Sequence, residues 1–576
     1  MLDPERPDSE QGQRPSFCVY RAKKVPRTYL VVSISRNESG IDHVELADGF
    51  ENRNCLDDLE AELKEAFEKR PPDNRIPITL MVHGFNTRRG AFEQQVLLDS
   101  DPGLYCDAGI RKRLGKDFDY ANAAFRGRDG FYIGYFWPSE GLLTWGSIKD
   151  SWRAFWFTPL IGLAMVVLPI LAGVWQALGS KHNSIISFLK ATVPAIYPAL
   201  ASVAKAVGFL FLPYGIAAIA TVLLGFGTLL VGLRLSTYLR DRYRALHYGV
   251  PDFGEFMRAL EGRLTKNNIK VRIDVIGHSM GTLLLINALR VMSDYFSPEK
   301  EHETHSIGRD GSIGLGSLIL CAADIPAAMV TVDYNNYFLS ALRRFESVHA
   351  LGNDRDIILK WLSSFANWIS EPRFDLAGRR LGNVMLVRRA KGPPPGDSRH
   401  EWTLWPVTRP IFRHFMLFEA DPARGKNKAE LMLYDFSLDE RLSAENATML
   451  LMGLALVTLT STLLLLHQKA DALWLLGMSV LFGVVGTIAR FVIKQTRDIP
   501  RIRAVVGFFA DLPTLLAFLP WCYSNPHGGY FLLGGHARAQ IARILCESRD
   551  RAPTMASTEG SDEKTGARWR KVVIAV

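Results

Sequence analysis

The stretch IDVIGHSMGTLLL, residues 273–285, decides the fold, because two apolar runs in it flank a short turn of small and polar residues. The turn is the pentapeptide GHSMG, in which Ser279 lies between Gly277 and Gly281. The ordinary interpretation is a strand, a turn and a helix whose first turn the serine caps. The alternative is a nucleophile elbow, a tight strand-to-helix turn that pushes the serine hydroxyl out of the chain. The two glycines favour the elbow, since they remove Cβ atoms that would collide there.

The pentapeptide alone is a weak signal, because glycine and serine are common residues, so its surroundings must decide. Around it, short apolar runs rich in β-branched and aromatic residues alternate with helix-like stretches. Strands are predicted at 29–34, 78–82, 131–137, 271–276, 317–322, 347–351 and 431–434, and helices at 56–69, 252–266 and 282–293. Alternation of this kind predicts an α/β fold, a mostly parallel sheet with helices on both faces.

Four long apolar segments interrupt this pattern, at residues 157–179, 207–233, 449–467 and 472–493. A membrane-spanning helix needs about 20 predominantly apolar residues, and each segment comes near or exceeds that length. They form two close pairs, which is typical of helical hairpins and less typical of the other possibility, buried core helices. We therefore expect two inserted transmembrane hairpins and four membrane helices.

Charge indicates how such a protein would be oriented. The net charge is +9, and basic runs follow the second and fourth apolar segments (RLSTYLRDRYR after 233 and KQTRDIPRIR after 493). Positive charge beside membrane helices marks the cytoplasmic side and attracts anionic lipid headgroups. The first 30 residues lack the apolar core of a signal peptide. The prediction is an integral protein of the inner or plasma membrane, with its catalytic domain in the cytoplasm.

These features divide the chain into eight expected parts. They are a disordered tail (1–14), a first part of a catalytic domain (15–150), hairpin 1 (151–235), a second part of that domain (236–445), hairpin 2 (446–495), an interfacial segment (496–521), a histidine loop with the last helix (522–550), and a tail (551–576).

Other function classes find little support in the sequence. The six cysteines are scattered without paired spacing, so neither a disulfide framework nor a zinc site is predicted. There is no phosphate-binding or dinucleotide-binding glycine motif, and no basic helix or aromatic-basic motif suited to reading nucleic-acid bases. We expect no metal, no cofactor and no nucleic-acid partner; the sequence leaves the oligomeric state open.

In a parallel sheet the chemistry gathers at the carboxyl ends of the strands, and there the chain resembles a known family. The motifs follow in the order HGFNT (83–87), FWPSEG (136–141), GHSMG (277–281), AADIP (322–326), NDRDIIL (353–359), GRRLGN (378–383), LMLYDFS (431–437) and PHGGYF (526–531). This order resembles a bacterial branch of uncharacterised serine hydrolases within the α/β-hydrolases, marked by an HGFN strand end. The resemblance covers roughly residues 75–545 without the hairpins. It implies a serine hydrolase with a Ser–Asp–His triad in that chain order.

The resemblance assigns the nucleophile and its oxyanion hole. Ser279 is the candidate nucleophile, which a histidine must activate and a carboxylate must orient. In this fold, the backbone N–H after the nucleophile and one from the His-Gly strand-end loop hold the oxyanion. Those N–H groups belong here to Met280 and Phe85.

Chain order places the triad histidine after the last strand. His527 lies there, in a loop rich in glycine and proline before a terminal helix, whereas His400 and His414 come before that strand.

Three carboxylates compete for the role of triad acid. The match favours Asp354, while Asp356 and Asp435 remain alternatives, because each also follows a strand. The competing interpretation of Asp354 is a cap on the helix that follows it.

Both hairpins leave the sheet at the edge that carries Ser279, which suggests a site opening toward the bilayer. The apolar stretches 184–206 and 505–521 are interfacial candidates beside it. We therefore predict a membrane-embedded serine esterase, similar to a lipase, that cleaves a lipid or acyl ester through an acyl-enzyme. The alternatives are a serine protease or thioesterase, and a catalytically inactive hydrolase-fold scaffold in the membrane.

Overall fold

A computed structural model of the chain divides it into two compact units, one formed by residues 1–141, 238–510 and 523–576 and the other by 142–237 and 511–522. The residues that the structure describes are 16–34, 49–51, 53–71, 74–101, 124–126, 129–139, 234–292, 306–307, 312–330, 338–342, 344–353, 356, 358–364, 366–367, 380–383, 386–388, 401–404, 415–418, 430–436, 527, 529–531, 536–550, 561–562, 567–568 and 570–575. In the second unit only the helical residues 234–237 are described; all elements named below belong to the first.

A ten-stranded sheet forms the centre of the first unit, in the order β1-β2-β4-β3-β5-β7-β8-β12-β15, with β6 beside β7. The strands are β1 (Phe17–Arg21), β2 (Thr28–Ser33), β3 (Ile76–Val82), β4 (Phe131–Phe136), β5 (Val271–His278), β6 (Ser306–Ile307), β7 (Ile313–Cys321), β8 (Ser347–Gly352), β12 (Glu430–Asp435) and β15 (Arg570–Ala575). From β2 to β12 all neighbours along this order are parallel, while β1, β6 and β15 pair antiparallel. The carboxyl ends of β3, β5, β7 and β8 therefore meet at one edge of the sheet.

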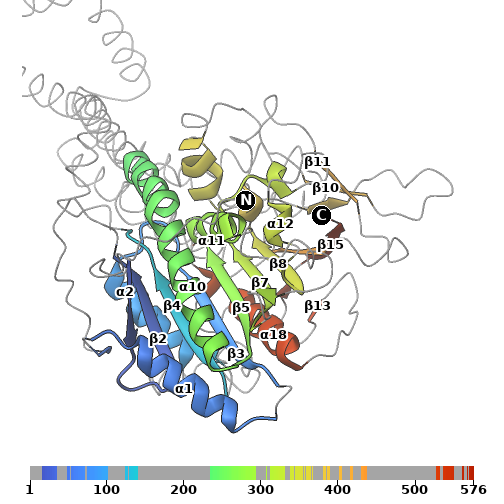
Figure 1. The fold of residues 1–576 in the computed structure, drawn as a ribbon. Helices are drawn as coiled ribbons and strands as arrows, with labels where there is room; N and C mark the ends of the chain where they lie inside the picture. Colours follow the sequence, from blue (N-terminus) through green and yellow to red (C-terminus); the bar gives the residue numbers. More distant parts are fainter. Residues whose placement is uncertain are drawn as a thin grey trace, which may run out of the picture. The chain divides into compact units, whose positions relative to one another are not determined.

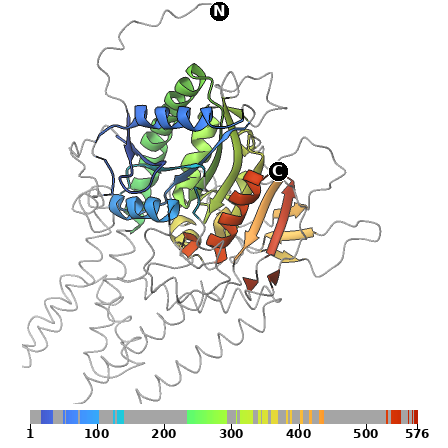
Figure 2. The same ribbon diagram turned by 90° about the horizontal axis from the view of Figure 1, so that it is seen from below.

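Helices cover both faces of the sheet (Figure 1 and Figure 2). The helices are α1 (Leu56–Glu68), α2 (Arg89–Ser100), α10 (Val250–Lys266), α11 (Met280–Val291) and α18 (His536–Asp550), and the π-helix η1 (Ala245–Gly249) leads into α10. On one face, Phe92 of α2 and Ile541 of α18 join a buried apolar cluster with strand residues such as Ile276 of β5. On the other, Phe253 of α10 packs edge-on against Tyr135 of β4, with ring centroids 5.0 Å apart. The predicted α/β class, with a mostly parallel sheet, is confirmed.

Smaller elements surround this centre. They are η4 (Ala327–Val330), α12 (Leu339–Leu342), η5 (Ile358–Ser363), η6 (Leu381–Asn383), η7 (Gly529–Phe531), a three-stranded antiparallel sheet of β9 (Leu386–Arg388), β10 (Glu401–Leu404) and β11 (Phe415–Phe418), and the pair β13 (Ser561–Asp562) and β14 (Ala567–Arg568).

All seven strands and three helices predicted from the sequence are present, most with ends shifted by one to four residues. The expected C-terminal tail at 551–576 needs correction, because β15 within it pairs antiparallel with β12 along the sheet edge. The strand sequence RKVVIA is rich in β-branched residues, which suit a sheet. This apolar run is short and follows a long polar stretch, so composition alone does not separate it from a tail.

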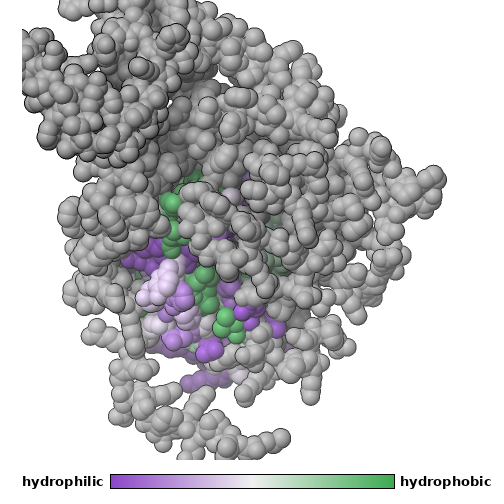
Figure 3. Space-filling view, turned by 90° about the horizontal axis from the view of Figure 1, so that it is seen from above, coloured by the Kyte–Doolittle hydropathy of each residue, from purple (hydrophilic) through white to green (hydrophobic). Residues whose placement is uncertain are grey.

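The predicted membrane segments 157–179, 207–233, 449–467 and 472–493 lie outside the described residues, as do 184–206 and 505–521. Within the described part of the chain, no helix has both the length and the apolar character needed to cross a membrane. Figure 3 shows hydrophilic and hydrophobic residues interspersed over the described part of one face. The large apolar side chains exposed among the described residues are Ile34, Tyr243 and Val291, which come from separate elements.

Candidate functional site

Ser279 occupies a strained turn between β5 and α11. Its backbone angles are φ 51° and ψ −125°, a positive φ that few residues other than glycine adopt. Its side chain makes no capping hydrogen bond to α11, so the interpretation of Ser279 as a simple helix cap is wrong. The side chain is 1% exposed, and its Oγ has no hydrogen-bond partner within the described residues. Strain together with an unpaired buried hydroxyl is characteristic of functional sites.

Close backbone contacts around the turn explain its glycines. A Cβ on Gly281 would lie 2.3 Å from the carbonyl oxygen of His83, so the start of α11 packs directly against the end of β3. A Cβ on Gly84 would lie 2.7 Å from both Ser279 Cβ and His278 Nδ1. Gly277 likewise has no room for a Cβ, which would meet the Leu285 side chain at 2.8 Å. Glycine at these positions therefore brings the HGFNT loop against the nucleophile candidate.

His83 holds that loop in place through both of its ring nitrogens. Its Nδ1–H donates to the carbonyl of Gly84 (2.8 Å), and its Nε2 accepts from the N–H of Trp137 (3.2 Å). Its ring also stacks on that of Trp137, with centroids 4.9 Å apart. Burial lowers the pKa of His83 to about 4, so it stays neutral near pH 7. The ends of β3 and β4 are thereby clamped together.

The two expected oxyanion donors come from different segments: Met280 follows Ser279 in the chain, and Phe85 belongs to the HGFNT loop. Met280 is the first residue of α11, and the first N–H groups of a helix lack an acceptor in the preceding turn. Phe85 follows Gly84, which touches Ser279, and its buried ring packs edge-on against Tyr238 at 5.5 Å. The next residue, Asn86, has a φ of 56° and donates its N–H to the buried carboxylate of Asp241 (3.4 Å). Tyr238 and Asp241 thus brace the loop; their positions on a helix gave no sequence signal of this role.

His527 is paired with Asp356, whose Oδ2 lies 2.7 Å from Nδ1 of the histidine. The other carboxylate oxygen accepts the N–H of Leu359 (3.0 Å) at the start of η5. Nδ2 of Asn383 donates to the carbonyl of Asp356 (3.1 Å) and fixes its loop. The Asp356 carboxylate therefore has two roles: it caps the first turn of η5 and it orients His527.

This pairing favours an alternative to the preferred acid. Asp354, which the resemblance favoured, lies outside the described residues. Asp435 ends β12, and its backbone pairs with Gly352. The carboxylate that contacts His527 is the alternative Asp356.

His278 joins the histidine loop to the nucleophile turn. Its Nε2 lies 2.7 Å from the backbone carbonyl of His527, and the two rings are 5.1 Å apart. Because its Nδ1 is bonded to Asp356, His527 in its neutral form presents Nε2 as an acceptor. That Nε2 is buried and has no partner among the described residues, so it and the Ser279 hydroxyl are both unsatisfied and not bonded to each other.

A buried polar network supports the turn from below. The N–H of Asp324 donates to Thr282 Oγ1 (3.1 Å) and lies 3.3 Å from the carbonyl of Ser279. Its carboxylate accepts from the Tyr238 hydroxyl (2.7 Å) and lies 3.4 Å from Nε of Arg380. Asp324 thus links the nucleophile turn to Tyr238 and Arg380, and no sequence pattern indicated that these two residues contribute.

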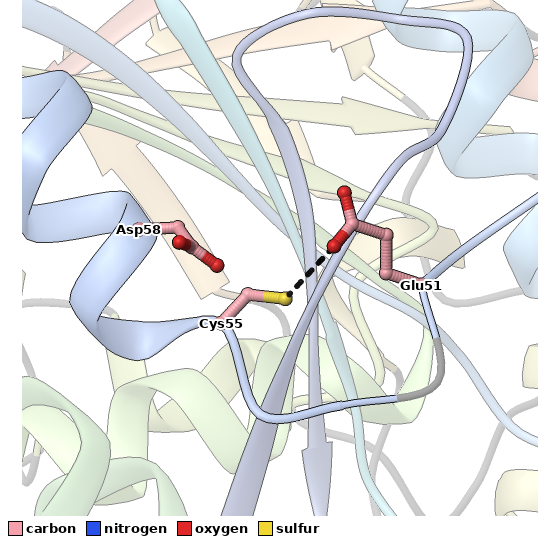
Figure 4. Close-up of side chains that lie close together, drawn as sticks. All are labelled: Glu51, Cys55 and Asp58. Carbon is pink, nitrogen blue, oxygen red and sulfur yellow. Dashed lines mark hydrogen bonds between the residues drawn. The ribbon is translucent and has the colours of Figure 1, made fainter.

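One group of side chains has the donor types of a metal site: Glu51, Cys55 and Asp58, far from Ser279 in the sequence (Figure 4). One arginine already pairs with both carboxylates, since Arg53 lies 3.0 Å from Glu51 and 2.7 Å from Asp58. The Cys55 thiol faces Glu51 Oε2 at 3.8 Å, and burial raises its pKa to about 11. We assign no metal to this cluster.

Comparison of the chain with protein-family models, with curated proteins and with solved structures found no match.

Proposed function

We propose that the protein is a serine hydrolase that cleaves an ester through an acyl-enzyme, with Ser279 as nucleophile, His527 as base and Asp356 as the orienting acid. One observation carries the proposal. A buried serine on a strained strand-to-helix turn has an unpaired hydroxyl, and the adjacent loop carries a histidine whose own unpaired Nε2 is oriented by a carboxylate 2.7 Å from Nδ1. A nucleophile, a base and an orienting group are the three parts that acyl transfer requires.

In the proposed reaction, Ser279 Oγ attacks the ester carbonyl carbon and its proton passes to Nε2 of His527. The oxyanion that forms accepts hydrogen bonds from the N–H groups of Phe85 and Met280. When the intermediate collapses, the C–O bond to the alcohol breaks and His527 returns the proton to the leaving oxygen. Water then attacks the acyl-enzyme by the same steps and releases the acid. Asp356 holds the tautomer of His527 that exposes Nε2.

The Ser279–His527 hydrogen bond is not formed in the structure. Such bonds are often long or misaligned without substrate and tighten in the complex. The two groups come from segments of separate elements, the turn after β5 and the segment before η7. The α/β-hydrolase fold, to which the motifs are similar, is part of this proposal and is supported by the parallel sheet with Ser279 at the carboxyl end of β5.

We further propose that the ester is a lipid or acyl ester and that the protein is embedded in the inner or plasma membrane, with this domain in the cytoplasm. The support is in the sequence: four apolar segments in two pairs, with basic runs after residues 233 and 493. Inserted hairpins would anchor the catalytic domain at the membrane, where a lipid ester substrate resides.

A fluorophosphonate probe, which forms a covalent bond with activated serines, tests the reaction class. Wild-type protein in membranes is expected to be labelled at Ser279, and Ser279→Ala is expected to lose labelling and ester turnover while still accumulating. An inactive scaffold would leave the wild type unlabelled. Because the same triad serves esters, thioesters and peptides, a panel of all three then separates an esterase from a thioesterase or protease.

A further inference from the structure

We propose that His278, the residue before the nucleophile, is a positioning residue that fixes His527 by donating a hydrogen bond to its backbone carbonyl. The inference rests on the proposed function, since it assumes that His527 is the base. It adds a second anchor for that histidine, beside the carboxylate of Asp356.

His278 lies where three segments meet: the nucleophile turn, the HGFNT loop and the histidine loop. Its Nε2–H donates to the carbonyl of His527 at 2.7 Å. Its Nδ1 side faces Gly84, where an added Cβ would come within 2.7 Å. Its ring meets that of Phe531 edge-on at 5.3 Å. The residue that carries the nucleophile turn thus touches both the oxyanion loop and the histidine loop.

The histidine loop needs such an anchor. His527 and His278 are 249 residues apart in the chain, so no local structure sets the distance between base and nucleophile. Asp356 fixes the ring of His527 at Nδ1, but a single bond to one ring atom leaves the ring free to pivot about it. A second bond at the backbone of the same residue restricts that freedom, because it fixes the point from which the side chain extends.

Packing alone does not account for a histidine at this position. An apolar side chain would fill the space against Phe531, but only a side chain with a hydrogen-bond donor can satisfy the His527 carbonyl. Burial, followed by the nearby His527, lowers the pKa of His278 to about 3. The ring therefore stays neutral at working pH, keeps its bare Nδ1 toward Gly84 and places its one proton on Nε2.

Matched substitutions separate the hydrogen bond from the packing. Glutamine carries an amide N–H near the position of Nε2, so His278→Gln keeps the donor. Asparagine is one methylene shorter, so the side chain in His278→Asn is still polar but no longer reaches the His527 carbonyl. His278→Leu removes the donor altogether. As control, His349 is also a buried histidine with two hydrogen bonds, to Tyr434 and Ser347, on β8. His349→Asn removes comparable bonds without contact to His527.

The readouts are the rate of fluorophosphonate labelling and the turnover of p-nitrophenyl butyrate and phenyl butyrate, with Tm measured for each variant. We expect His278→Asn and His278→Leu to be labelled about 10–100-fold more slowly, the loss typical of a misplaced catalytic group. We expect His278→Gln to recover to within about threefold, and His349→Asn to keep the wild-type rate. Turnover of phenyl butyrate should fall further than that of p-nitrophenyl butyrate, because the poorer leaving group needs the proton of His527 more.

Several results would overturn the inference. One is wild-type labelling in a folded Asn or Leu variant; either variant suffices if the other fails to fold. Another is equal loss in the Gln and Asn variants, or an equal loss for the two esters. If instead the wild type is not labelled at Ser279, the proposed function itself fails, so the two failures are distinguishable.

Discussion

At the scale of single residues, the carboxylate partner of His527 decides how the proposed triad operates. Asp356 is fully buried, and its two oxygens have separate partners, His527 and the N–H of Leu359. The sequence motifs pointed to this loop but favoured Asp354, two residues earlier. The choice depends on how the chain turns after β8, where Asn353 accepts the N–H of Asp356 (3.1 Å). No residue pattern encodes that turn.

We predict that Asp356→Asn lowers ester turnover by about 10³–10⁴-fold, because an amide no longer holds the tautomer of His527 that exposes Nε2. Asp354→Asn and Asp435→Asn serve as matched controls and should keep most activity. Turnover of p-nitrophenyl butyrate by the purified variants measures the effect. A larger loss in Asp354→Asn than in Asp356→Asn would return the acid to the position that the resemblance favoured.

A second prediction concerns Asp252 in the first turn of α10, which accepts a hydrogen bond from the Ser33 hydroxyl of β2. Burial raises the pKa of the Asp252 carboxyl to about 6. The folded protein thus holds this proton more tightly than the unfolded chain, whose aspartates titrate near pH 4. The free energy of unfolding contributed by Asp252 therefore falls as pH rises from about 4 to about 6.

Asp252→Asn removes this titration and leaves a neutral side chain that still accepts from Ser33. We expect the variant to be more stable than the wild type above about pH 6, by on the order of 1–2 kcal/mol after allowance for solvent screening. The difference should vanish near pH 4. Tm of both proteins across this pH range provides the measurement; a stability difference that is the same at pH 4 and pH 7 would contradict the prediction.

At the scale of elements, α18 connects the histidine loop to the sheet. Arg538, fully buried, is ion-paired with Asp99 of α2, donates to the carbonyl of Phe531 (3.2 Å) and lies over the ring of Phe125 at 4.3 Å. Removing one partner of a buried pair leaves an uncompensated charge. Phe531 is also the ring that His278 contacts, so the pair supports the loop of His527 as well as the helix.

We predict that Arg538→Gln destabilises the fold by about 3–5 kcal/mol. The exposed pair of Arg543 and Glu547 on the same helix, 2.7 Å apart, gives the control, since Arg543→Gln should cost less than about 1 kcal/mol. Chemical denaturation of both variants distinguishes them. Equal stabilities would show that α18 is held by its apolar face alone.

The elements that could be predicted from the sequence are those with a clear apolar pattern. The strands of the centre are continuous apolar runs and the helices α1, α10 and α11 have clear apolar faces, so both were foreseen. Helix α2 was missed because its buried face includes Glu93, Asp99 and Ser100, polar residues that interrupt the apolar pattern. Edge strands β1 and β15 were missed because each is short and next to charged sequence. In the candidate site, the sequence motifs singled out Ser279, His527 and the acidic loop. Tyr238, Asp241 and Arg380 could not be singled out, because they act through contacts between segments that are distant in the sequence.

At the scale of the whole molecule, the direction in which Ser279 faces is the main question. The nucleophile turn and the acid loop lie at the carboxyl ends of β5 and β8, and the chain enters the first apolar pair after β4 and the second after β12. In a parallel sheet these ends share one edge, so insertions that begin there would bring that edge to the bilayer. The apolar stretch 505–521, shortly before His527 in the chain, would add an interfacial surface.

We therefore predict that the protein remains in membranes after carbonate extraction and hydrolyses long-chain esters in vesicles faster than short soluble esters. Phe508→Glu and Phe509→Glu, within 505–521, should reduce long-chain turnover in vesicles several-fold, because a charge opposes insertion of this stretch between the headgroups. The same variants should retain turnover of p-nitrophenyl butyrate, which reaches Ser279 from water, and Ser279→Ala should abolish both. Release of the protein by carbonate would contradict the membrane proposal. Faster hydrolysis of short esters, with or without lipid, would contradict the orientation of Ser279 toward the bilayer. A site that opens to the bilayer should take long-chain substrates from the membrane.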